Sequence, residues 1–317
     1  MASRVQRERQ EDFLETQDPF RTNAFKLISK MIELINEAPG DTTHLLDEML
    51  HSIFFVGKVN EPTFSPESIL MDKDLLRRLR DLFPRAFELF SSHLPRRSPF
   101  SCVLDMIVHL NGPSNEEEIL SGLRNLIIGL DLGDSRELIS STICVSYITD
   151  PDKFYGVSIA APTAATSGKF NPRRCVISAS CLYYWDECVA GAVLTYYPDN
   201  KMKPDYDGTI QLPQGVRCQA FSLKENRETP ACKSCRNLFG LRSNSEDVSV
   251  YGNCAEAESL SNLFRNEPEI KERARPTSAK YSDEKRDTCR KNISKYLKNC
   301  LKDKKFTWKE GDFYIPS

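Results

Sequence analysis

The sequence lacks the segments that mark membrane and secreted proteins. No apolar run approaches the roughly 18 residues of a membrane-spanning helix, and the first twenty residues contain no apolar signal-peptide segment. Neither glycine-rich motif that cradles nucleotide phosphates occurs, so phosphate-loop and dinucleotide-binding chemistry is not supported. We therefore expect no membrane association and a location in the cytoplasm, with the nucleus as the alternative.

An excess of one charge is also missing, because 43 Lys and Arg residues face 45 Asp and Glu residues. A net charge of −2 gives no overall attraction to nucleic acid, although a local patch can still exist. Residues 268–310 hold 14 basic and 7 acidic side chains, among them several aromatic residues. This segment predicts either a solvated helix with its aromatic side chains packed inward or a surface that binds nucleic-acid phosphates.

Histidine is scarce. The chain has four, all at or before His109, so a site in the later part has to work without imidazole unless both halves meet around it. It has eleven cysteines, and all except Cys102 lie from Cys144 onward. In a reducing compartment, cysteines are buried apolar groups, metal ligands or reactive thiols rather than disulfides.

The 317 residues are enough for two domains, and 40% apolar with 28% charged residues is typical of a globular protein. Apolar residues at helical spacing predict helices from about residue 22 to 130 and another over 134–143. Short runs rich in β-branched and aromatic residues then predict strands at 143–148, 154–161, 175–185, 189–197, 217–223 and 248–251. Further helices are expected at 233–240, 255–265 and 282–302, followed by a last strand within 306–315.

These patterns predict an α+β protein in which an N-terminal all-helical domain precedes a mixed α/β domain. We expect a flexible segment over residues 1–20, the helical domain over 21–145 and the α/β domain over 146–317. The helical domain could bind a protein partner.

One group of cysteines has the spacing of a metal site. Cys232 and Cys235 form a C-x-x-C pair, and eighteen residues separate them from Cys254. A second C-x-x-C would need a cysteine at position 257, which is Ala257. Three thiolates plus water are the ligand set of a catalytic zinc, and Glu256 could carry the proton of that water.

Two other interpretations of the same cysteines stay open. They could be core residues without a metal, since unpaired cysteines are among the most buried residue types. They could also form a closed zinc site that takes a fourth ligand from Cys218, Cys289 or Cys300. Glu258 is expected to be a solvated carboxylate that points away from Glu256.

The segment Cys254-Ala255-Glu256 resembles the C-A-E motif of zinc-dependent cytidine deaminases, and Cys232 to Cys235 resembles their P-C-x-x-C motif. In that superfamily the metal lies between two helix N-termini, and the glutamate is a general acid/base rather than a ligand. The resemblance implies that Cys232, Cys235 and Cys254 bind Zn²⁺ and that Glu256 is catalytic. Here the two motifs occur in reversed order, and Ala231 separates Pro230 from Cys232.

The resemblance therefore implies hydrolytic deamination of a cytosine-type base or nucleoside, free or within a nucleic acid. The competing hypothesis is a non-enzymatic interaction protein, in which the helical domain binds a partner and the second domain is a degenerate or structural relative of the enzyme. The enzyme hypothesis predicts three converging sulfurs and a Glu256 carboxylate that faces an open fourth position. A fourth protein ligand or a filled cavity favours the alternative.

Overall fold

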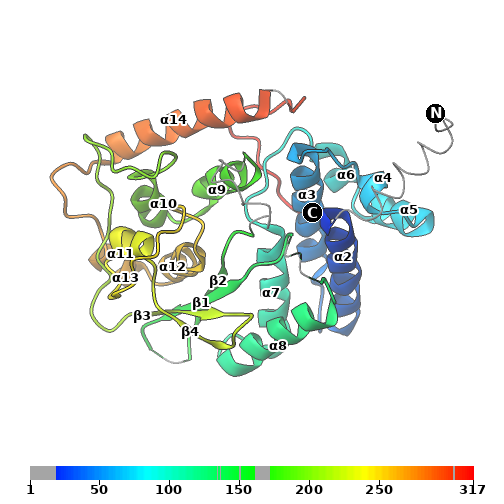
Figure 1. Ribbon diagram of the computed structural model, residues 1–317, viewed down its shortest axis with the longest axis horizontal. Helices are drawn as coiled ribbons and strands as arrows, with labels where there is room; N and C mark the ends of the chain where they lie inside the picture. Colours follow the sequence, from blue (N-terminus) through cyan, green and yellow to red (C-terminus); the bar gives the residue numbers. More distant parts are fainter. Residues whose placement is uncertain (1–18, 134, 136, 150, 161–171, 303) are drawn as a thin grey trace, which may run out of the picture.

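The computed structural model describes residues 19–317, apart from 134, 136, 150, 161–171 and 303. Within these residues it contains thirteen helices and four strands, so the predicted α+β class is confirmed (Figure 1). None of the described helices is long and apolar enough to cross a membrane. The predicted flexible segment 1–20 lies almost entirely outside the described residues.

Helices form the first part of the chain, as the apolar periodicity predicts. They are α2 (Pro19–Glu37), α3 (Thr43–Val59), α4 (Pro66–Ile69), α5 (Lys73–Leu82), α6 (Pro84–Leu89), α7 (Pro99–Asn111) and α8 (Glu116–Gly129). The side chains of Ser65, Asp72 and Ser98 accept hydrogen bonds from backbone N–H groups at the starts of α4, α5 and α7. The helix predicted over 134–143 is wrong, because the described residues there are turns and the start of a strand.

The sheet has four antiparallel strands in the order β2-β1-β3-β4. The strands are β1 (Thr142–Tyr147), β2 (Phe154–Val157), β3 (Arg217–Ser222) and β4 (Arg227–Thr229). Cys144 in the central strand lies between Gly156 of β2 and Ala220 of β3. Helix α12 (Ala255–Asn266) packs on β1, β2 and β3, and the Asn262 side chain donates to the Tyr155 carbonyl at 2.8 Å.

Two predicted strands are instead helices. Residues 175–185 belong mainly to α9 (Pro172–Tyr184), and residues 189–197 begin within α10 (Glu187–Leu194). All residues of α10 from Cys188 to Leu194 are buried. A helix that is buried all round shows no polar face, so its sequence pattern cannot be told from that of a buried strand.

The C-terminal helices are α11 (Lys233–Phe239), α12, α13 (Pro268–Arg273) and α14 (Asp283–Lys302), which confirms the three helices predicted there. Residues 248–251 do not form the predicted strand. The last predicted strand is reduced to one parallel bridge between Leu94 and Phe313.

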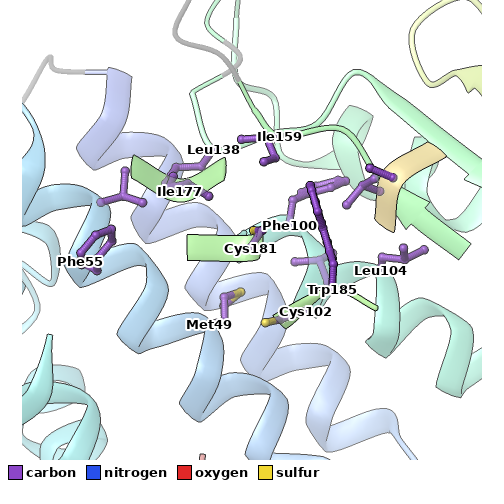
Figure 2. Close-up of a cluster of buried hydrophobic side chains, with 14 of the residues drawn as sticks. Met49, Phe55, Phe100, Cys102, Leu104, Leu138, Ile159, Ile177, Cys181 and Trp185 are labelled. Carbon is purple, nitrogen blue, oxygen red and sulfur yellow. The ribbon is translucent and has the colours of Figure 1, made fainter. Parts of the chain in front are cut away.

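One buried apolar cluster runs from Phe20 to Tyr314. Figure 2 shows part of it, where Met49 of α3, Phe100 of α7 and Cys181 of α9 lie together. The core thus continues across residue 145, where the two domains were predicted to divide. The domain boundaries remain a prediction.

Candidate metal centre

The C-x-x-C pair lies where α11 begins. Cys232 is the N-cap residue of this helix, with φ −70° and ψ 165°, and Cys235 follows three residues later in the first turn. Residues three apart on a helix face the same side, so the two thiols point to one place.

The third thiol lies at the start of α12. Cys254 is its N-cap residue, with φ −80° and ψ 151°. Gly252 has φ +86°, and a Cβ there would lie 2.8 Å from the Val193 side chain, so the preceding turn requires glycine. The Asn253 carbonyl accepts a hydrogen bond from the Ile159 backbone N–H at 2.9 Å, which ties this turn to the segment after β2.

The three sulfurs converge as the spacing predicts. The Sγ atoms of Cys232, Cys235 and Cys254 all lie within 4.8 Å of one another, and those of Cys232 and Cys254 are 3.5 Å apart. Tetrahedral zinc with Zn–S bonds of about 2.3 Å holds its sulfurs roughly 3.8 Å apart. Both the donor type and the spacing therefore fit a metal ion such as zinc.

Hydrogen bonding among the thiols favours one thiolate. Hydrogen bonds with the thiols of Cys235 and Cys254 lower the pKa of Cys232 far below its usual value. Their own pKa values are raised, first by these hydrogen bonds with Cys232 and then by burial. Both helix N-termini present positive dipole ends near this cluster, which also favours anionic sulfur.

Glu256 is the second residue of α12 and is only 4% exposed. Burial raises its carboxyl pKa to about 7. Together with Cys232 and Cys254 it lines a cavity of about 440 Å³, a size typical of small-molecule sites. The cavity wall also carries neutral polar side chains, those of Ser141, Thr142, Ser158, Thr229, Ser249 and Asn253.

A second cavity of about 570 Å³ also reaches Glu256. Ala220, Thr229 and Pro230 line both cavities, so the β3–β4 hairpin forms the wall between them. Exposed Arg242 and half-buried Cys218 lie in the wall of the second cavity. Glu256 therefore lines both cavities.

The other cysteines do not join the cluster. Among the described residues, no fourth Cys, His, Asp or Glu belongs to the group. The Cys218 Sγ lies 3.6 Å from that of Cys144, while Cys289 and Cys300 are on α14. All the described cysteines are free thiols. A closed site with one of the three proposed fourth ligands is therefore not what the structure shows.

Asn253 is a cavity residue that the sequence argument did not single out. Its side-chain oxygen accepts a hydrogen bond from the Ser178 hydroxyl, and its Nδ2 is buried without a partner among the described residues. Its position directly before Cys254 was the one available signal. The serine and threonine residues of the cavity wall have no such signal in the sequence, because they come from separate strands and loops.

Searches with this chain match no protein-family model, no curated protein and no solved structure. A functional assignment therefore depends on the chemistry of the site itself.

Proposed function

We propose that this protein is a zinc-dependent hydrolytic deaminase that acts on a cytosine-type base or nucleoside. One observation carries the proposal: three thiol sulfurs converge at two helix N-termini, and two of them, those of Cys232 and Cys254, line a cavity together with the buried Glu256. This is the arrangement that the resemblance to cytidine deaminases implies.

In this proposal Cys232, Cys235 and Cys254 are the metal ligands. Zinc bound there would make hydroxide available near neutral pH, because it lowers the pKa of water. Cys232 and Cys254 line the same cavity as Glu256, so a water molecule in this cavity could serve as the fourth ligand. An open position is what distinguishes a catalytic zinc site from a structural one.

Glu256 would carry the proton. A C–O bond from water forms at the ring carbon that bears the amino group, the C–N bond breaks, and ammonia leaves. Glu256 accepts a proton from the attacking water and returns it to the departing nitrogen, and the second water proton ends on the ring nitrogen, so that the base and one water become the oxo product and ammonia. The neutral hydroxyl and amide groups of the cavity wall offer hydrogen bonds to an uncharged heterocycle.

A closed or filled site would favour the competing hypothesis of a non-enzymatic interaction protein. Within the described residues there is neither a fourth ligand of the usual types nor a filled cavity beside the sulfurs. These two observations support the enzyme proposal. A partner of the helical part remains compatible with it.

The test combines metal content and turnover. We expect about one zinc per purified chain by elemental analysis, lost in Cys254→Ala and retained in the control Cys218→Ser. Glu256→Gln should keep its zinc but release ammonia from cytidine or a cytosine-containing single strand at least ~100-fold more slowly.

The exposed Glu269→Gln on α13 serves as the carboxylate control and should leave the rate unchanged. Absence of stoichiometric zinc, or zinc that survives Cys254→Ala, would show that the site is wrong. Full zinc content without turnover of any cytosine substrate would instead favour the interaction protein.

A further inference from the structure

Helix α14 has two different faces. Its buried residues, Cys289, Ile293, Ser294, Leu297 and Leu301, face the protein, and the helix contacts α9 and α10. Another face, about 120° around the helix, carries a row of four exposed lysines, Lys291, Lys295, Lys298 and Lys302. At about 100° and 1.5 Å per residue, this lysine row spans an arc of roughly 60° and a length of about 16 Å.

The lysine row has little acidic compensation. Lys298 lies 3.3 Å from the Glu310 carboxylate, and both side chains are about half exposed. In the part of the chain that the structure describes, the other three lysines form no ion pair within 4.0 Å, although Lys291 also interacts electrostatically with Glu310. Lys305 and Lys309, also exposed, extend the positive charge beyond the helix.

The fold does not account for this row. Like charges three and four residues apart on a helix repel, so each neighbouring pair opposes helix formation. The helix dipole favours cations only in the last turn, which explains Lys302, and Asp287 four residues before Lys291 favours Lys291, but neither effect explains Lys295 or Lys298. An anion lying along the row would remove the repulsion.

The aromatic residues of this segment are turned inward, which confirms that part of the solvated-helix prediction. The ring of Tyr296 packs edge-on against Tyr197 at 6.0 Å, and that of Phe306 against Phe55 at 5.4 Å. Trp308 is 9% exposed. The row therefore offers charge without a platform on which bases could stack, which favours phosphate contacts over single-strand recognition.

A membrane fits this face poorly. Among the described residues, none of the exposed large apolar side chains lies on α14. An interfacial helix needs an apolar face to insert, and that of α14 is packed against the protein.

We propose that the lysine row binds the phosphate backbone of duplex nucleic acid without reading its sequence. A duplex strand supplies a regular line of negative charge along the full length of the row. In Figure 1, α14 lies along one edge of the molecule, away from the sheet. The proposal is independent of the deaminase assignment, since it requires neither zinc nor turnover.

The test is salt-dependent binding of a fluorescent duplex of about 20 base pairs to the full chain. Four phosphate contacts predict a slope of log K against log salt of about −3 to −4. Changing all four row lysines to Gln should remove most of that slope and weaken binding at least ~10-fold at about 50 mM salt.

The matched control changes four exposed lysines elsewhere, Lys73, Lys201, Lys224 and Lys280, to Gln. It alters the net charge equally and should keep the wild-type slope. Equal losses in both variants, or no binding of wild type at about 100 μM, would overturn the proposal. So would a polyglutamate peptide or an anionic-lipid vesicle that binds with the same slope and the same dependence on the row.

Discussion

Glu256 and Glu258 are two residues apart on α12 but have different surroundings. Glu256 lines two cavities, whereas Glu258 is 8% exposed and accepts a hydrogen bond from the Val157 backbone N–H at 2.8 Å. The prediction that Glu258 is solvated was therefore wrong. It assumed one buried face, but α12 is buried around most of its circumference, between the sheet and other helices.

Burial of Glu258 makes stability depend on pH. Burial raises the pKa of this carboxyl from 4.5 to about 7. Between these two pKa values the carboxyl is ionised in the unfolded chain but still protonated in the folded chain. The contribution of Glu258 to the free energy of unfolding therefore falls as pH rises from about 4.5 to 7, and it is constant above pH 7. The expected cost above pH 7 is about 3 kcal/mol.

Glu258→Gln removes this titration. The difference in the free energy of unfolding between variant and wild type should therefore be about 3 kcal/mol larger, in favour of the variant, at pH 8 than at pH 4.5. Urea unfolding of both proteins at pH 4.5, 6 and 8 measures the difference, and parallel pH profiles would contradict it.

At the scale of elements, the close contact between β2 and α12 positions the helix that follows Cys254 in the candidate metal centre. A Cβ on Gly156 would lie 2.2 Å from the Ser259 backbone nitrogen and 2.7 Å from the Ala255 carbonyl oxygen. Both are backbone atoms of α12, whose N-cap residue is Cys254, so only glycine allows this approach.

Gly156→Ala is expected to cost about 3 kcal/mol, the upper end for overpacking, and to weaken zinc binding because α12 must move. The control is Gly129→Ala at the end of α8, where a Cβ meets no atom within 4 Å. That change should be neutral or stabilising by up to about 1 kcal/mol. Chemical unfolding and competitive chelation measure the two effects, and equal stabilities of the two variants would refute the packing argument.

At the scale of the whole molecule, the C-terminal segment packs against the N-terminal helix α3. Tyr314 is 1% exposed, its hydroxyl donates to Asp47 of α3, and its ring stacks on His51 with centroids 3.9 Å apart. The Ser317 backbone N–H also donates to Asp47, at 2.7 Å. The last residues of the chain thus complete the core formed by its first helices.

Tyr314→Phe should lose about 1–3 kcal/mol of stability, because it removes a buried donor from the Asp47 carboxylate and keeps the ring. Ile315→Ala, one residue away and 53% exposed in wild type, should change stability by less than about 0.5 kcal/mol. Thermal unfolding measures the stability of both variants. An equal loss of stability in Ile315→Ala would contradict a specific role for the Tyr314 hydroxyl.

The amphipathic helices, three of the strands and the C-x-x-C pair could be predicted from the amino-acid sequence. These features depend on local spacing: apolar residues every three to four positions, and a C-x-x-C pair at a helix start. It also located Glu256 beside Cys254, since adjacency on a helix needs no tertiary information.

Three features became visible only in the folded chain: α9 and α10 are helices, Glu258 is buried, and the sulfurs of Cys232 and Cys254 lie 3.5 Å apart. Each depends on which distant segments cover a residue. A segment covered on every side loses the polar face that periodicity detects, and a cavity wall is assembled from residues far apart in the chain. The local spacing of residues therefore predicted the candidate chemistry. The packing of segments far apart in the chain determined where in the molecule that chemistry can take place.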